Sequence, residues 1–107
     1  MTTYVFIGRI FFPYTMKGKE VCTILDPVVV GKVIQQYREE KGLSQEVLSG
    51  LADIGRTHLS AIERGMRKPT LETFYRIGEA LHIHPSTILE SIEKEMEGLS
   101  TEERRHP

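Results

Sequence analysis

Residues 43–68 most restrict what this chain can fold into, because they hold two short helical patterns separated by a three-residue break. Ser44 is a preferred N-cap residue and can accept a hydrogen bond from the first turn of a helix. The Asp-Ile-Gly sequence at 53–55 ends that helix, since Asp and Gly both tolerate turn conformations. Leu59 and Ile62 are three residues apart and therefore share one face of a second helix. The pattern therefore predicts two short helices that are joined by a sharp three-residue turn and face the same core.

The faces of these two helices differ in chemistry. Helical spacing directs four apolar residues of the first helix inward: Val47, Leu48, Leu51 and Ala52. The second helix directs polar or small residues away from the core: Arg56, Thr57, Ser60 and Ala61. Basic residues follow directly after it, at Arg64, Arg67 and Lys68. The two helices thus combine an apolar inner side with a polar and basic outer side.

Three further helices are predicted around these two. The first runs from about residue 29 to 41, stops at Gly42 and has an inner face of Val30, Val33, Ile34 and Tyr37. The fourth starts after Pro69 and has an inner face of Leu71, Phe74, Ile77, Gly78 and Leu81. The fifth opens at Pro85, closes at Gly98 and has an inner face of Ile88, Leu89, Ile92 and Met96. A core of five short helices is about what 107 residues can bury.

An apolar segment rich in β-branched and aromatic residues precedes the helices. Residues 3–12 and 20–25 have the composition of strands and flank a loop containing Gly18, which predicts a β-hairpin. We expect the hairpin to pack on the helices or to pair with a second chain; the alternatives are disorder and an upstream extension of a chain that starts near Met16. The apolar run is too short to span a bilayer and lacks the features of a signal peptide. The predicted parts are an N-terminal extension (1–27), a helical domain (28–98) and a flexible tail (99–107).

Composition and charge narrow the function further. The single cysteine, Cys22, excludes an intramolecular disulfide and a cysteine-based zinc site, which fits a reducing, cytoplasmic location. The formal net charge is −1, but residues 31–68 hold seven basic and five acidic side chains, whereas residues 86–107 hold three basic and six acidic ones. Positive charge therefore gathers around the second helix of the motif, and the C-terminal part would repel phosphate.

The motif resembles the helix-turn-helix domains of the Cro-repressor and xenobiotic-response-element family. The resemblance covers about residues 30–92 and rests on a Gly-Leu-Ser-Gln start, an Ile-Glu-Arg-Gly end and a following Pro-Thr-Leu. Asp53 stands at a turn position that is usually Gly in the family, and Gly55 stands where Ser or Thr usually opens the recognition helix. The geometry tolerates both changes, although Gly55 supplies no side-chain acceptor. The resemblance implies an all-α, five-helix, lambda-repressor-like fold that binds DNA.

The outer face and the resemblance together give a candidate DNA-binding set. Arg56, Thr57 and Ala61 are expected to face base edges, with Arg56 donating to guanine N7 and O6. His58 and Ser60 flank these residues. Phosphate contacts are expected from Gln45, Arg64, Arg67 and Lys68, and Ser44 completes the set. The alternative is that the basic side chains form a solvated surface and that Gln45 is a merely exposed polar residue.

Arg38 and Glu63 match the positions that form a largely buried ion pair in this family. Such a pair would tie the second helix of the motif to the first helix of the bundle. The alternative is two independent surface charges, and exposed pairs contribute only ~0–1 kcal/mol.

Other kinds of chemical site have less support in the sequence. His82 and His84 have neither a nearby cysteine nor a third ligand, so loop and cap roles are favoured over metal binding. Asp53, His58 and Ser60 are the residue types of a hydrolytic triad, but a turn and one short helix imply no oxyanion site. We therefore expect neither enzyme activity nor a metal or other cofactor.

The sequence favours a sequence-specific transcriptional regulator, and more narrowly a repressor. A homodimer on a palindromic operator is expected, because one recognition helix reads too few base pairs for genomic selectivity. Two narrower alternatives are an antitoxin that represses its own operon, with a toxin as its partner, and a controller protein of a restriction-modification system. An alternative from another class is a protein-interaction module without base readout. The exposed Arg56 and Thr57 favour DNA over that module, and no membrane partner is expected.

Overall fold

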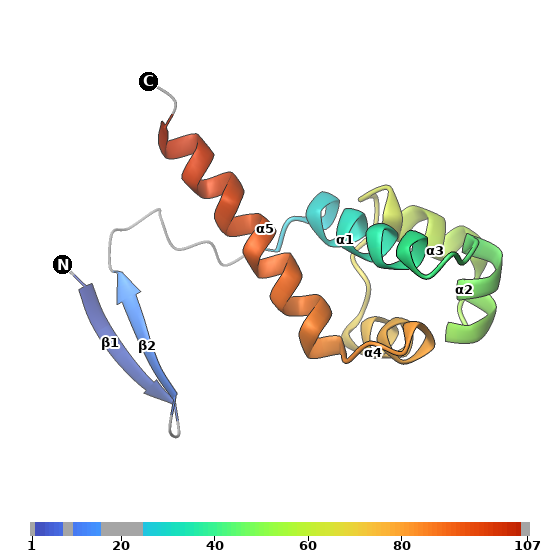
Figure 1. Cartoon of the computed structure of the whole chain (residues 1–107), viewed down its shortest axis with the longest axis horizontal. Helices are drawn as coiled ribbons and strands as arrows, with labels where there is room; N and C mark the ends of the chain where they lie inside the picture. Colours follow the sequence, from blue (N-terminus) through green and yellow to red (C-terminus); the bar gives the residue numbers. More distant parts are fainter. Residues whose placement is uncertain (1, 8–9, 16–24, 106–107) are drawn as a thin grey trace.

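Five helices follow a two-stranded sheet in the computed structural model, which describes the backbone of residues 2–7, 10–15 and 25–105 and the side chains of residues 25–98. Strands β1 (Thr2–Ile7) and β2 (Ile10–Thr15) pair in antiparallel fashion. The helices in chain order are α1 (Pro27–Glu40), α2 (Gln45–Ala52), α3 (Arg56–Glu63), α4 (Leu71–Leu81) and α5 (Pro85–Arg105) (Figure 1). The all-α class predicted for the helical domain is confirmed.

The described strands differ from the prediction within residues 2–15. Strands β1 and β2 occupy the stretch where the prediction places a single strand, at residues 3–12, which it ends at Pro13. The second predicted strand, at 20–25, falls almost entirely outside the described residues. Each strand of a two-stranded sheet is an edge strand, where proline is tolerated, and β2 accordingly continues through Pro13. Cys22 and the rest of residues 16–24 lie outside the described part of the chain.

The caps of α2 and α3 follow from the local sequence. Ser44 Oγ accepts a hydrogen bond of 3.1 Å from the backbone nitrogen of Val47, which starts α2 as predicted. Asp53 ends α2 in the left-handed conformation, with φ 56° and ψ 47°. Gly55 is the N-cap of α3 and gives it no side-chain hydrogen bond. The break between the two helices is therefore a tight turn, as the Asp-Ile-Gly sequence predicts.

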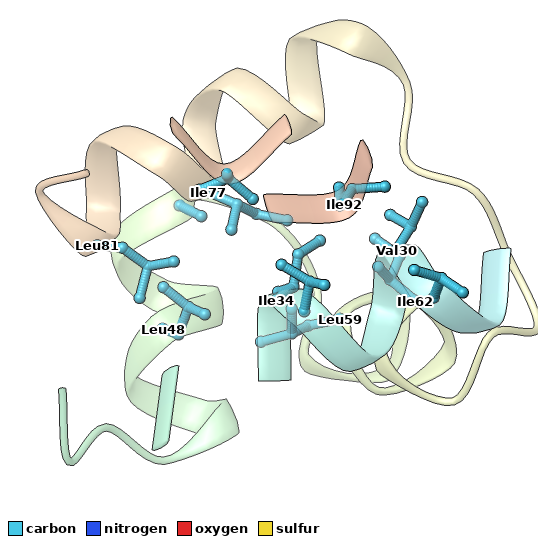
Figure 2. Packing of buried hydrophobic residues seen from close by; sticks show 12 residues of the cluster. Val30, Ile34, Leu48, Leu59, Ile62, Ile77, Leu81 and Ile92 are labelled. Carbon is cyan, nitrogen blue, oxygen red and sulfur yellow. The ribbon is translucent and has the colours of Figure 1, made fainter. Parts of the chain in front are cut away.

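The core lies between the helices and draws side chains from all five of them (Figure 2). Eight large side chains are fully buried: Ile34, Leu48, Leu59, Ile62, Ile77, Leu81, Ile88 and Ile92. Four apolar residues that the periodicity directs inward are instead exposed: Val47, Leu51, Leu71 and Leu89. Each of these four lies at the margin of an apolar helix face that is wider than the surface covered by neighbouring helices. Helical spacing thus predicts the centre of each buried face better than its edges.

Two helix boundaries also differ from the prediction. Helix α1 begins at Pro27 rather than near residue 29, because Asp26 Oδ1 accepts a hydrogen bond of 2.9 Å from the backbone nitrogen of Val28. Helix α5 does not close at Gly98 but continues to Arg105, since a glycine inside a helix costs only about 1 kcal/mol. Among the described residues, none of the helices combines the length and the apolar character that crossing a membrane requires.

Candidate functional site

Helix α3 packs on α1 and α2 and directs its opposite face to solvent. Leu59 and Ile62 are fully buried, as their spacing predicts. Arg56 and Thr57 at the first turn are exposed, whereas the predicted flanking residues are half-buried: His58, Ser60 and Ala61. The most exposed side chains of α3 are therefore those of its first two residues.

The last turn of α3 lies unusually close to α1. A Cβ atom added to Gly31 would collide with the carbonyl oxygen of Ile62 and would lie 2.8 Å from the carbonyl oxygen of Glu63. Only a glycine allows the two helix backbones to approach this closely at Gly31. The sequence prediction did not identify this contact, because glycine at this position has no local signal apart from its presence inside an apolar helix face.

A charged pair fixes the same end of α3. Arg38 Nε donates to Glu63 Oε2 at 2.7 Å, and Arg38 Nη2 donates to Glu63 Oε1 at 3.0 Å. Both residues are buried, at 9% and 7% exposure. The hydrogen bond to Glu63 raises the pKa of the Arg38 guanidinium above its ordinary value, and this outweighs the effect of burial, which lowers it. The predicted ion pair is present, and the alternative of two independent surface charges is wrong.

Arg38 and Glu63 also hold the start of α2. Arg38 Nη1 donates at 2.7 Å to the carbonyl oxygen of Leu43, which directly precedes the N-cap of α2. Gln45 Nε2 donates at 2.9 Å to Glu63 Oε1. The amide of Gln45, which the sequence prediction assigns to a phosphate contact, thus uses one of its N–H groups within the protein. The beginning of α2 and the end of α3 are therefore joined through one carboxylate.

The basic residues after α3 are all exposed. Arg64 Nε donates at 3.3 Å to the carbonyl oxygen of Ser60, so its side chain stays beside the helix that precedes it. Gly65 has a φ of +77° and turns the chain, after which come Arg67 and Lys68. Ser44 is exposed at the beginning of α2. The structure consequently presents the polar first turn of α3 together with basic side chains beyond its last turn.

The sequence also contains the residue types of a hydrolytic triad, at Asp53, His58 and Ser60, and of a metal site, at His82 and His84. Residue Asp53 is exposed at the turn, and His82 ends α4 in the left-handed conformation with a φ of 58°, which is a cap role. Within the described residues, no three histidine, cysteine, aspartate or glutamate side chains lie together in a way that could hold a metal ion. The polar face of α3 is thus the candidate site that the geometry supports.

Comparisons with known proteins agree with this geometry. A helix-turn-helix family model matches residues 34–88. The chain is 36% identical over 64 residues to control protein C.BamHI of Bacillus amyloliquefaciens, covering 59% of this chain and 79% of that protein. It is 33% identical over 72 residues to the HTH-type transcriptional regulator SinR of Bacillus subtilis, covering 65% of each chain. The crystal structure of the restriction-modification controller protein C.AhdI from Aeromonas hydrophila superimposes with a TM-score of 0.58 at 34% identity, covering 61% of this chain and 98% of that one.

Proposed function

This chain belongs to the helix-turn-helix family, and we propose that it is a transcriptional regulator that binds double-stranded DNA in a sequence-specific way. One observation carries the proposal: α3 is held by its buried end while Arg56 and Thr57 at its start are exposed. An exposed helix start with a guanidinium and a hydroxyl offers donors that match base edges in a major groove. Relatives named as transcriptional regulators and as control proteins support the same function.

In the proposed complex the first turn of α3 enters the major groove. Arg56 donates to guanine N7 and O6, Thr57 reaches a base or a phosphate, and Ala61 contributes a methyl-sized contact one turn further on. The remaining members of the predicted set position the helix on the duplex through phosphates or flank the base contacts: Ser44, Gln45, His58, Ser60, Arg64, Arg67 and Lys68. Because the net charge is −1, affinity rests on this limited set of contacts rather than on a general attraction to DNA.

We further propose a homodimer that represses transcription from a palindromic site. One recognition helix reads too few base pairs to be selective in a genome, and a second copy doubles the number of base pairs that are read. The likeness to C.BamHI and C.AhdI supports a second, narrower candidate, a controller protein of a restriction-modification system. The proposal includes no catalytic role and no cofactor, and it places the protein in the cytoplasm, as expected for a regulator that binds DNA.

Selection of bound sequences from a random pool of double-stranded DNA tests this proposal. We expect enrichment of an inverted repeat whose half-sites are about one helical turn (~34 Å) apart. The same experiment separates a DNA reader from a protein-interaction module on the same scaffold. A folded protein that enriches no sequence over successive rounds would reject base readout in favour of the interaction module.

A further inference from the structure

One large apolar side chain is exposed between basic ones directly after α3. Met66, in the loop between α3 and α4, is 70% exposed. Arg64, Arg67 and Lys68 beside it are exposed as well, and residues 64–68 include no acidic side chain. Methionine is among the residue types that are most often buried. Met66 therefore provides an apolar contact surface within a positively charged loop.

The backbone that carries this side chain is held in place. The backbone nitrogen of Met66 donates at 2.9 Å to the carbonyl oxygen of Ala61, and that of Gly65 donates at 3.0 Å to the carbonyl oxygen of Ile62. With Gly65 at a φ of +77°, these two hydrogen bonds form the glycine-centred cap known as the Schellman motif. A Cβ atom at Gly65 would lie 2.8 Å from Val28 Cα, so the turn also packs tightly on the start of α1. Met66 is consequently presented from a fixed point.

The cap places Met66 next to the outer face of α3. In this motif an apolar residue at the position of Met66 commonly packs on the last turn of the helix, whose Ala61 carbonyl it binds. Ala61 lies one turn after Thr57 on the face to which the proposed function assigns the base contacts. Because 70% of its surface is open, Met66 keeps most of its side chain available for a second molecule.

We propose that Met66 is a further DNA-contacting residue, which packs on apolar carbon atoms of the duplex beside the bases read by α3. This inference rests on the proposed function. Duplex DNA offers two apolar surfaces there, the C5 methyl group of thymine in the major groove and the deoxyribose rings at the groove edge. An unbranched, polarisable thioether side chain adapts to irregular surfaces of this kind.

The charges of the loop support DNA as the partner. The centres of protein interfaces are depleted in charged residues, whereas Met66 has three exposed cations within two positions of it. A polyanion neutralises all three cations at once, and its phosphates lie on both sides of the apolar surfaces. Phosphate contacts by Arg64, Arg67 and Lys68 would thus bring Met66 onto the groove.

Binding of the full chain to a synthetic duplex with the sequence selected by the parent tests this contact. Met66→Ala should bind roughly 5-fold more weakly per half-site, as expected for loss of a partly buried methionine side chain. The slope of the logarithm of the binding constant against the logarithm of the salt concentration should stay unchanged, because no charge is removed. Met66→Leu, which keeps the apolar volume, should retain most of the affinity. The matched control is Leu51→Ala on α2, at a residue exposed to a similar extent, which should bind as the parent does.

Replacing thymine by uracil in the duplex removes the C5 methyl group and identifies the surface that Met66 contacts. A methyl contact predicts one position in each half-site at which uracil weakens binding by the parent but not by Met66→Ala. A deoxyribose contact predicts that no uracil substitution depends on Met66, and that Met66→Ala weakens selected and unselected duplexes alike. Either result supports the proposal.

Parental affinity of Met66→Ala for selected and unselected duplexes would overturn the proposal and leave Met66 with its role in the α3 cap or with a protein partner. Met66→Gln, which keeps the length of the side chain but not its apolar tip, should bind as weakly as Met66→Ala. Both variants should unfold at the parental urea midpoint, since Met66 is mostly exposed. A parent that selects no DNA sequence rejects the proposed function itself. A parent that selects a sequence, to which Met66→Ala binds equally well, rejects the Met66 contact alone.

Discussion

The two ends of α3 differ in burial, in capping and in hydrogen bonding. At its end, Ile62 is fully buried, and the Glu63 carboxylate accepts hydrogen bonds from both Arg38 and Gln45. At its start, Gly55 provides no side-chain cap, and Arg56 and Thr57 are exposed. The fold is thus anchored at one end of the helix, and the other end is available to another molecule.

Under the proposed function, stability and DNA recognition depend on separate turns of the same eight-residue helix. A helix of this length is unstable alone, so the contacts at its end also set the direction of its start. Substitutions at the end should lower the free energy of unfolding. Substitutions at the start should change ligand binding and leave that free energy almost unchanged.

The largest effect is expected for Gly31→Ala. The new methyl group would meet two backbone carbonyl groups of α3, and backbone cannot move aside as a side chain can. We expect a loss of at least about 3 kcal/mol in the free energy of unfolding, at the upper end of what overpacking costs. Gly50→Ala is the matched control, because a Cβ at Gly50 in α2 meets nothing within 4 Å. It should stabilise the protein by up to ~1 kcal/mol. Equal unfolding midpoints for both variants in urea would contradict the close approach of α1 and α3.

Glu63→Ala is expected to have the next largest effect. The substitution leaves the buried Arg38 guanidinium without its carboxylate and Gln45 without its acceptor. We expect a loss of about 3 kcal/mol, as for other buried pairs that lose one partner. Arg76→Ala, which breaks an exposed pair on α4, should cost less than about 1 kcal/mol. If Glu63→Ala lowers the free energy of unfolding by less than ~0.5 kcal/mol in chemical denaturation, the Arg38–Glu63 pair contributes no more than an exposed surface pair does.

The sequence predicts the helices and the centre of the core because local rules govern both. Ser44, Asp53 and Gly55 act through their own side chains or backbone preferences, and each takes the role that its residue type predicts. The exposure of Leu51 and Leu71 could not be predicted, because it depends on how far neighbouring helices extend across each face. Strand β2 continues through Pro13, where the prediction ends a strand, because proline is tolerated at a sheet edge and only the sheet topology shows that β2 is one.

Some features of the candidate site can be predicted from neighbouring residues, whereas others depend on residues that are distant in the sequence. The outward direction of Arg56 and Thr57 follows from the helical spacing of Leu59 and Ile62. The Arg38–Glu63 pair spans 25 positions and was identified through the family resemblance, not through spacing. The hydrogen bond from Gln45 to Glu63 joins residues 18 positions apart, and no sequence pattern indicated it. Contacts between distant residues need either the structure or a relative whose positions can be matched.

Whether the start of α3 reads DNA is tested by comparing Arg56→Ala at its start with Arg64→Ala beyond its end, on DNA selected by the parent. Arg56→Ala should lose roughly 1–3 kcal/mol of binding free energy and relax the preference at one base pair in each half-site. Arg64→Ala should weaken binding to all sequences about equally. The slope of the logarithm of the binding constant against the logarithm of the salt concentration should become less steep by about one per chain. Both variants should unfold within about 0.5 kcal/mol of the parent. If Arg56→Ala binds the selected site as tightly and as selectively as the parent, the start of α3 does not read DNA.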